Sequence, residues 1–275
     1  MIAEKFISIY DVPIRIMRGR KANLSIFMSI LPKAEEVMQK IVKTPCSQDI
    51  YAIRYTLARQ INGNERFDED TYLNDFIKKP WGHEYRVYCD SMFDVWKLRI
   101  DQAQTTSMHC HLHKDTVLLC LGGTGTTTFI DGAVHYVTPG SHIYIPRGVF
   151  HQTAADRGNA LHLVEVENPR NKFDLLRISD PYGRKLAPYE GDDDAETGIE
   201  PMEGLGPGRF MRRQDTERKF RFQLFEGIYA PLLEAPISVI SLDLRHHVDG
   251  RIRLMNSNGQ AQVRRKHTYL AIFPS

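Results

Sequence analysis

The sequence contains no long apolar run. None of its hydrophobic stretches reaches the roughly 18 residues that a membrane-spanning helix needs. The stretch Leu24–Leu31 follows several basic residues, as the apolar part of a signal segment would. It starts late, however, and is interrupted by Ser25 and Ser29, which favours a buried core segment. We therefore expect a cytoplasmic protein without a membrane partner.

The sequence also lacks closely spaced cysteines and an excess of charge of one sign. Its 36 basic and 34 acidic side chains leave a net charge of +2, which gives no reason to expect a nucleic-acid partner. Four isolated cysteines are typical of small buried thiols in a reducing compartment rather than of a disulfide framework. They are Cys46, Cys89, Cys110 and Cys120.

Residues 1–76 are predicted to be a helical region. Apolar residues recur at helical spacing after Pro32 and again after Ser47, a suitable N-cap, and Asn62-Gly63 is a stop signal. The two stripes consist of Ala34, Val37, Met38, Ile41 and Val42, and of Ile50, Ile53, Leu57 and Ile61. We expect a helical hairpin whose apolar faces pack either on the rest of the chain or on a second subunit of a homodimer.

The rest of the sequence divides into three regions, at residues 77–187, 188–209 and 210–275. In the first, short β-rich runs alternate with Gly, Pro and Asp turns, and Asp131-Gly132 predicts a hairpin. Many short strands without intervening helices favour an antiparallel sandwich or barrel. The second region is predicted to be an acidic, glycine-rich linker. The third is again β-rich, either as an extension of the main sheet or as a degenerate second half-barrel.

Histidines are concentrated in the predicted barrel, with seven of the eleven between residues 109 and 162. On a strand, His109, His111 and His113 would share one face, and neutral imidazole is a common metal ligand. Taken alone, this pattern suits a histidine-rich exposed face as well as it suits a metal site. A second segment favours the metal, because Pro146 and Gly148 end a strand with a turn that directs His151 inward.

These two segments resemble the two motifs of the cupins. The first is His109-x-His111, and the second runs through Gly140, Pro146, Gly148 and His151. Lys79-Pro80-Trp81-Gly82 and the segment Asp174–Arg184 are similar to the first and last segments of mannose-6-phosphate isomerase-like cupins, so the resemblance spans residues 79–184. It implies a jelly-roll β-barrel that binds one divalent metal ion (Zn, Mn, Fe or Ni) through His109, His111 and His151.

The sequence departs from the cupin pattern where an acidic ligand is expected after His111. That slot falls on Asp115 or on Thr116, depending on which glycine ends the first motif. Strand alternation favours Asp115 as a fourth ligand, whereas the apolar run that follows favours Thr116 and a site of three histidines. Both arrangements stay open at this point.

The resemblance implies an enzyme that acts on a sugar, phosphorylated or activated, by proton transfer at the metal, as isomerases and epimerases do. His113 and Glu165 are candidate bases. Substrate-binding candidates are Lys97, Arg99, Tyr144 and Arg147, of which Lys97 and Arg99 share a strand face and could point into the barrel together. The alternatives are a three-histidine Fe(II) dioxygenase and a sugar-binding cupin without catalysis.

Overall fold

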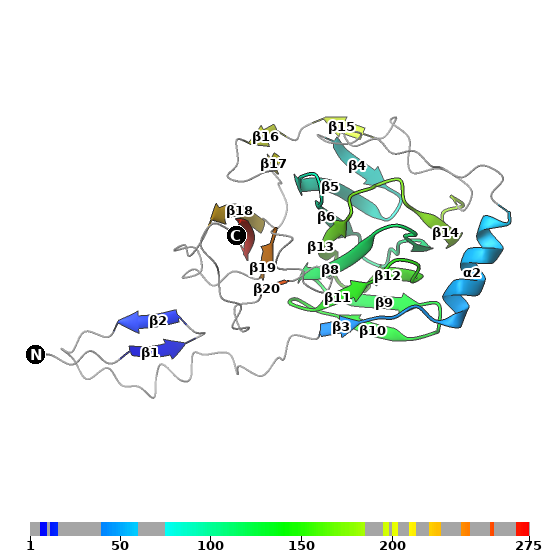
Figure 1. Ribbon diagram of the computed structural model, residues 1–275, viewed down its shortest axis with the longest axis horizontal. Coiled ribbons are helices and arrows are strands. Elements are labelled where there is room, and N and C mark those ends of the chain that lie inside the picture. The colour runs from blue at the N-terminus through cyan, green and yellow to red at the C-terminus, as the bar shows by residue number, and fades with distance from the viewer. Residues whose placement is uncertain are drawn as a thin grey trace, which may run out of the picture.

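A computed structural model of the chain describes residues 6–9, 12–15, 40–59, 75–184, 195–197, 200–202, 209–212, 220–226, 238–242, 254–255 and 268–274. Within these residues the fold is mainly β, as predicted. Two large sheets enclose a core, and a third sheet lies outside the larger of them (Figure 1). No helix among the described residues combines the length and the apolar character that a bilayer crossing demands.

The larger sheet has ten strands. They are β3 (Lys40–Val42), β4 (Asp75–Lys79), β5 (Gly82–Cys89), β6 (Asp94–Ile100), β8 (Asp115–Gly122), β11 (His142–Ile145), β13 (Leu161–Asn168), β15 (Ala195–Thr197), β16 (Glu200–Met202) and β17 (Arg209–Arg212). The main path runs β15-β4-β5-β6-β13-β8-β11-β3, and β17 pairs with β5 and β16. Two of these strands, β15 and β16, lie inside the predicted linker, so that part of the linker joins the sheet.

The five-stranded sheet faces the larger one and completes the barrel. Its strands, in spatial order, are β10 (Val134–Val137), β9 (Gly125–Phe129), β12 (His151–Ala155), β7 (Met108–Cys110) and β14 (Leu176–Ser179). Trp96, Leu98 and Leu118 of the larger sheet share a buried cluster with Phe129 and Ala155 of the smaller one. Apolar side chains between two mainly antiparallel sheets give the predicted jelly-roll type of sandwich.

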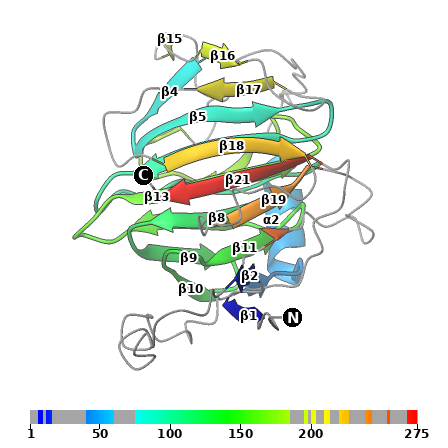
Figure 2. The ribbon, with the colours of Figure 1, turned by 90° about the vertical axis from the view of Figure 1, so that its left-hand side faces the viewer.

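A four-stranded sheet covers the outer face of the ten-stranded sheet (Figure 2). It contains β18 (Phe220–Glu226), β19 (Ser238–Ser241), β20 (Leu254–Met255) and β21 (Thr268–Pro274). Ile240, Leu270 and Ile272 pack there against Val117 and Val164. The large sheet is therefore buried on both faces, which explains why 117–121 is continuously apolar instead of alternating.

The predicted helical N-terminal region is wrong in part. A two-stranded sheet forms from β1 (Phe6–Ile9) and β2 (Val12–Arg15), and β3 pairs in parallel with β11. Residues 40–42, expected to end the first helix, therefore form a strand. β-branched Ile41 and Val42 favour extended backbone, and this segment pairs with β11 at the edge of the large sheet. The rest of that stripe, 34–38, lies outside the described residues.

The second predicted helix is present as α2 (Ser47–Leu57), but it is rotated from the expected orientation. Its buried residues are Asp49, Ala52 and Thr56, whereas Ile50 is 57% exposed. The Asp49 carboxylate sets this rotation by accepting hydrogen bonds of 2.8 Å from the backbone N–H groups of Cys46 and Phe150. The helix therefore packs on the barrel, against the strands that carry the histidines.

Candidate metal centre

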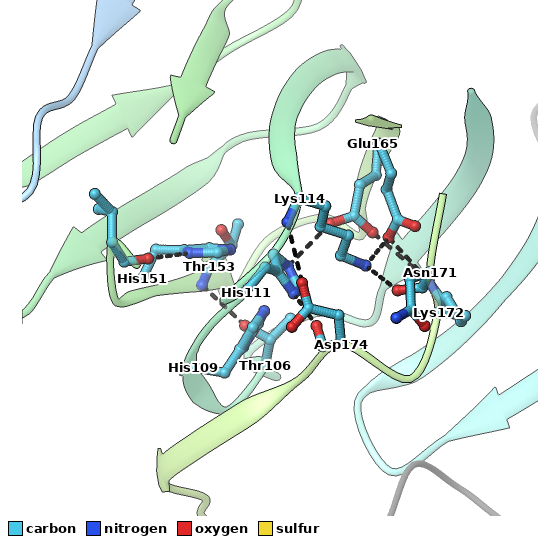
Figure 3. Close-up of polar contacts among 12 residues, drawn as sticks. Thr106, His109, His111, Lys114, His151, Thr153, Glu165, Asn171, Lys172 and Asp174 are labelled. Atoms are coloured by element: carbon cyan, nitrogen blue, oxygen red, sulfur yellow. Dashed lines mark hydrogen bonds and ion pairs between the residues drawn. The ribbon is translucent and has the colours of Figure 1, made fainter. Parts of the chain in front are cut away.

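Three histidines from the two cupin-like segments meet inside the barrel. His109 lies on β7 and His151 on β12, and the two are direct cross-strand partners. Their ring centroids are 4.5 Å apart, and His111 completes the group at 5.2 Å from His109 and 5.7 Å from His151. One nitrogen of each ring lies within 4.8 Å of the others. The three predicted ligands are thus brought together (Figure 3).

Backbone carbonyls orient all three rings in the same way. Nδ1 of His109 is 2.8 Å from the Ser107 carbonyl oxygen, Nδ1 of His111 is 2.6 Å from that of Asp174, and Nδ1 of His151 is 3.1 Å from that of Val149. Because a carbonyl oxygen only accepts, each Nδ1 carries the hydrogen. Each Nε2 then presents its lone pair to the common centre, as in metal sites whose ligands are held by outer hydrogen bonds.

The surroundings keep these imidazoles neutral. Burial lowers the pKa of His109 and of His111 well below the usual value, helped by the charge of neighbouring groups, and burial lowers the pKa of His151 to about 4. A neutral ring can donate a lone pair to a cation, whereas a protonated one cannot. At neutral pH the three side chains are therefore in the form that binds metal.

Two local devices hold the ligand segments in place. The Asp174 carboxylate accepts hydrogen bonds from the backbone N–H groups of Leu112, His113 and Lys114, at 2.9, 2.8 and 3.1 Å. On the other side, Gly148 has φ of +80°, which suits glycine, and donates from its backbone N–H to the His111 carbonyl oxygen at 2.6 Å. The turn after His111 is thus tied to the turn before His151.

A cavity of about 60 Å³ opens beside the histidines. Glu165 on β13 lines it, and its Oε1 is 3.9 Å from His111 Nε2. Burial raises the pKa of Glu165 to about 7, against the opposing charge of Lys172. A carboxyl group with this pKa exchanges a proton readily near neutrality, as a general base does. Of the two predicted bases, Glu165 is therefore the one that the fold brings to the histidines.

His113, the other predicted base, lies outside the cavity. Its side chain is 76% exposed, and its Nδ1 is 3.3 Å from Asp174 Oδ1. The expected alternation along a strand ends at Cys110, where β7 stops and the chain turns. His113 therefore does not share the direction of His109 and His111.

The sequence comparisons agree with this geometry. Residues 96–167 match the family described as Cupin domain. This segment is a cupin domain. The match confirms the resemblance that the two histidine motifs predicted.

Similar proteins carry related segments. The chain is 27% identical over 146 residues to a mannose-1-phosphate guanylyltransferase of Salmonella montevideo, which covers 52% of this chain and 30% of that protein. The enzyme of the same name from Sinorhizobium fredii is 26% identical over 126 residues, with 45% and 24% covered. The chain thus spans less than a third of the length of these curated relatives. Among solved structures, the capsular polysaccharide assembling protein CapF from Staphylococcus aureus aligns at a TM-score of 0.34 and 17% identity over 38% of this chain and 34% of that one.

Cupins carry an acidic ligand after the second histidine of the first motif, and in this cupin domain the residue at the corresponding inward-facing position is Thr116. Asp115 points away from the histidines, and its carboxylate accepts hydrogen bonds of 2.9 Å from the Tyr144 hydroxyl and from the Arg147 backbone N–H. Thr116 lies on the inner face of β8 with Leu118 and is fully buried. The alternation that favoured Asp115 fails because the turn between β7 and β8 resets which residues face inward. The prediction that Asp115 is a fourth ligand is therefore wrong, and the structure groups the three histidines without it.

The four predicted substrate-binding residues also lie outside the cavity that the cupin domain encloses. On β6, Trp96, Leu98 and Ile100 take the inner face, so Lys97 and Arg99 point to the outer one. Tyr144 belongs to the outer apolar cluster. Arg147 is exposed beside Asp115. The expectation that Lys97 and Arg99 point into the barrel is therefore wrong. The apolar residues that alternate with them on β6 are buried in the barrel core, so the two charged side chains lie on the opposite face.

Other charged residues line the cavity instead. They are Lys79, Lys114, Lys172, Arg177 and Arg184, together with Glu84, Glu165 and Glu167. Arg177 and Arg184 lie in the segment that resembles the last part of the isomerase-like cupins, and Arg184 donates two hydrogen bonds of 2.9 Å to the Asp180 carboxylate. The position of Arg177 and Arg184 in that segment could have indicated from sequence that they line the cavity. Lys172 carried no such signal, because it lies in a turn between motifs.

The residues present fit one divalent ion. Three neutral imidazoles supply nitrogen ligands that suit Zn, Mn, Fe or Ni, and the adjoining cavity leaves room for further ligands. His111 Nε2 is buried and makes no hydrogen bond to the described residues, an arrangement that costs stability unless a cation or water binds there.

Proposed function

We propose that this chain binds one divalent metal ion through His109, His111 and His151 and acts on a sugar or a sugar phosphate by proton transfer. The observation that carries the proposal is the convergence of three Nε2 lone pairs on a cavity that also contains Glu165. When bound, the ion supplies Lewis-acid chemistry that polarises hydroxyl and carbonyl oxygens.

The residues of the chain divide the remaining work. In this proposal Glu165 takes the proton from the hydroxyl-bearing carbon next to the carbonyl and returns it to the former carbonyl carbon, while the hydroxyl proton moves to the former carbonyl oxygen. Thr106, Ser107 and Thr153 line the cavity on the histidine side and offer hydroxyl groups to the hydroxyls of a polyol. Trp81 and Leu98 supply apolar wall that excludes water from the reacting atoms.

The sugar part of the proposal draws on family likeness. The relatives from Salmonella montevideo and Sinorhizobium fredii are named for mannose 1-phosphate. The residues that match the cupin family, 96–167, include the three histidines. Lys79, Trp81, Arg177 and Arg184, which belong to the isomerase-like segments, line the cavity. A fold alone does not determine a reaction, so these points support the substrate class and no named substrate.

A second candidate is a three-histidine Fe(II) dioxygenase. It is favoured by the orientation of Asp115, whose carboxylate is engaged by Tyr144 and Arg147 and leaves three neutral ligands. The dioxygenase requires Fe(II) and consumes oxygen as a second substrate, whereas the proton-transfer enzyme requires neither.

Metal analysis followed by isotope exchange tests the proposal. The purified protein is assayed for Zn, Mn, Fe and Ni, and hexose 6-phosphates are incubated with it in deuterated water. We expect deuterium at the carbon next to the carbonyl, lost on removal of metal and in Glu165→Gln, which keeps its metal. Oxygen uptake with Fe(II) and no exchange would favour the dioxygenase. Bound metal with neither reaction would leave a binding cupin and contradict the proposal.

A further inference from the structure

A single peptide group lies between helix α2 and one histidine of the candidate metal centre. Its carbonyl oxygen belongs to Val149 and is 3.1 Å from Nδ1 of His151. Its N–H belongs to Phe150 and donates a hydrogen bond of 2.8 Å to the carboxylate of Asp49, which lies on α2. The two ends of this peptide group therefore connect the Asp49 carboxylate to the His151 imidazole.

The Asp49 carboxylate has a fixed place in the structure. The residue is 2% exposed, and its second oxygen accepts a hydrogen bond of 2.8 Å from the Cys46 backbone N–H at the start of α2. Both bonds join a carboxylate to a backbone donor, and such bonds are stronger than those between two neutral groups. The helix and the Phe150 backbone are thus fixed relative to each other.

Side-chain packing brings α2 against the same turn. Ala52 and Phe150 belong to one buried cluster. The Ile53 side chain lies against the turn at Gly148, where an added Cβ would be 3.4 Å from Ile53 Cδ1. The helix is not part of residues 96–167, which match the cupin family. A part of the chain beyond the family segment therefore contacts the turn that precedes the third histidine.

The charge of Asp49 strengthens the hydrogen bond that His151 makes. Hydrogen bonds in a chain polarise one another, so a peptide group whose N–H donates to a carboxylate has a carbonyl oxygen that accepts more strongly. A strong acceptor at Nδ1 fixes the plane of an imidazole ring and makes its Nε2 a better electron donor to a metal. Asp49 can therefore act on the ligand nitrogen without touching the ring.

We propose that Asp49 is a positioning residue of the metal centre, which acts on His151 through the peptide group between Val149 and Phe150. The inference rests on the proposed function, because it takes His151 as a ligand of the ion. It adds to that function a residue that neither cupin motif contains, and it makes helix α2 a part of the metal centre.

Zinc affinity and the imidazole signals in proton–nitrogen NMR spectra test the proposal. Asp49→Ala removes both hydrogen bonds and should lower zinc affinity, measured by competition with a chelator, about 10- to 100-fold. Asp49→Asn keeps one acceptor oxygen without the charge and should lie between wild type and Asp49→Ala. In Asp49→Asn the Nδ1–H signal of His151 should move toward that of a weaker hydrogen bond, while the signals of His109 and His111 stay in place. A general loss of structure would shift all three.

Ile50→Gly is the matched control. It weakens the helix at the next position, which is 57% exposed, and leaves both Asp49 hydrogen bonds in place. Its zinc affinity should therefore differ from wild type by no more than about twofold. An affinity that is unchanged in both Asp49 variants, or that falls as far in Ile50→Gly, would overturn the proposal. If Asp49→Ala does not fold, Asp49→Asn decides the question.

Spectra of the metal-free protein separate this inference from the proposed function. The hydrogen bonds of Asp49 and His151 do not require the ion, so Asp49→Asn should shift the His151 signal in this form too. A shifted signal in a protein that binds no zinc would contradict the metal-dependent function and support the positioning role. Zinc binding with unchanged imidazole signals in both forms would contradict the positioning role and leave the metal centre standing.

Discussion

The two ends of the cavity are built on different principles. At one end, each of the three histidines is held by a hydrogen bond from Nδ1 to a backbone carbonyl. At the other end, Lys114, Lys172, Glu84 and Glu167 hold one another by side-chain charge. The histidine end can therefore lose a side chain without leaving a charge behind, whereas the ion-pair end cannot. Metal binding and folding stability should respond to separate sets of substitutions.

The largest effect is expected at the histidine end. His111→Ala or His151→Ala removes one of three neutral ligands, so metal content should fall from about one ion per chain to near zero. Circular dichroism should show a retained fold. His113→Ala, an exposed neighbour, is the control and should keep full metal content. If the His111→Ala, His151→Ala double variant binds metal as wild type does, the site lies elsewhere.

The next effect belongs to the ion-pair end. Glu167→Gln keeps the shape of the side chain but leaves the buried Lys114 ammonium, 2.7 Å away, without its counter-charge. We expect the free energy of unfolding to fall by about 3–5 kcal/mol in denaturant titrations, because an unpaired buried charge is strongly destabilising. A loss below about 1 kcal/mol would mean that this end of the cavity is solvated and that the contrast with the histidine end is mistaken.

Asp174 connects the two ends and should give an intermediate result. Its carboxylate fixes the 112–114 turn, and its carbonyl oxygen orients His111. Asp174→Ala should lower metal affinity about 10- to 100-fold, as loss of an outer hydrogen-bonding residue does. Asp174→Asn, which keeps one acceptor oxygen, should lose less. Competition with a chelator measures the metal affinity of both variants. Equal affinities in wild type, Asp174→Ala and Asp174→Asn would show that metal binding does not depend on the hydrogen bonds from the 112–114 turn to Asp174.

The smallest effect is expected for an ion pair at the surface. Lys43 Nζ is 2.7 Å from Asp131 Oδ2, with 30% of the Asp131 side chain exposed. Asp131→Asn should cost at most about 1 kcal/mol, because solvent screens the pair. The hydrogen bond from Lys43 lowers the pKa of Asp131. The contribution is therefore fully present above the unfolded pKa of about 3.9 and is lost as the pH falls through the lower folded value. A stability difference that grows in acid would contradict this assignment.

The three-histidine cluster could be predicted from the sequence because its determinants are local. His109 and His111 lie two residues apart, one on β7 and the other directly after its last residue, Cys110. Pro146 and Gly148 form a turn that can direct His151 in few ways. The predicted pairing of Asp131-Gly132 also follows from short-range turn chemistry, and β9 and β10 form that hairpin. Such features depend on a handful of neighbouring residues.

The errors arose where a distant contact decides orientation. The inward position of Thr116 depends on the turn that Asp174 clamps, 60 residues away in sequence from Lys114. The rotation of α2 depends on the bond from Phe150 to Asp49. The error at Lys97 has a local cause instead, because strand alternation puts it on the face opposite Trp96, Leu98 and Ile100, which belong to the inner cluster. The distant contacts that orient Thr116 and α2, by contrast, cannot be inferred from the periodicity of one segment.

The central claim is that three imidazoles hold a single ion. X-ray absorption spectroscopy of zinc-loaded protein tests it directly, because imidazole nitrogen and thiolate sulfur scatter differently. The account predicts three imidazole nitrogens at about 2.0–2.1 Å, one further light atom and no sulfur. A sulfur shell at about 2.3 Å, or fewer than three imidazoles, would contradict it.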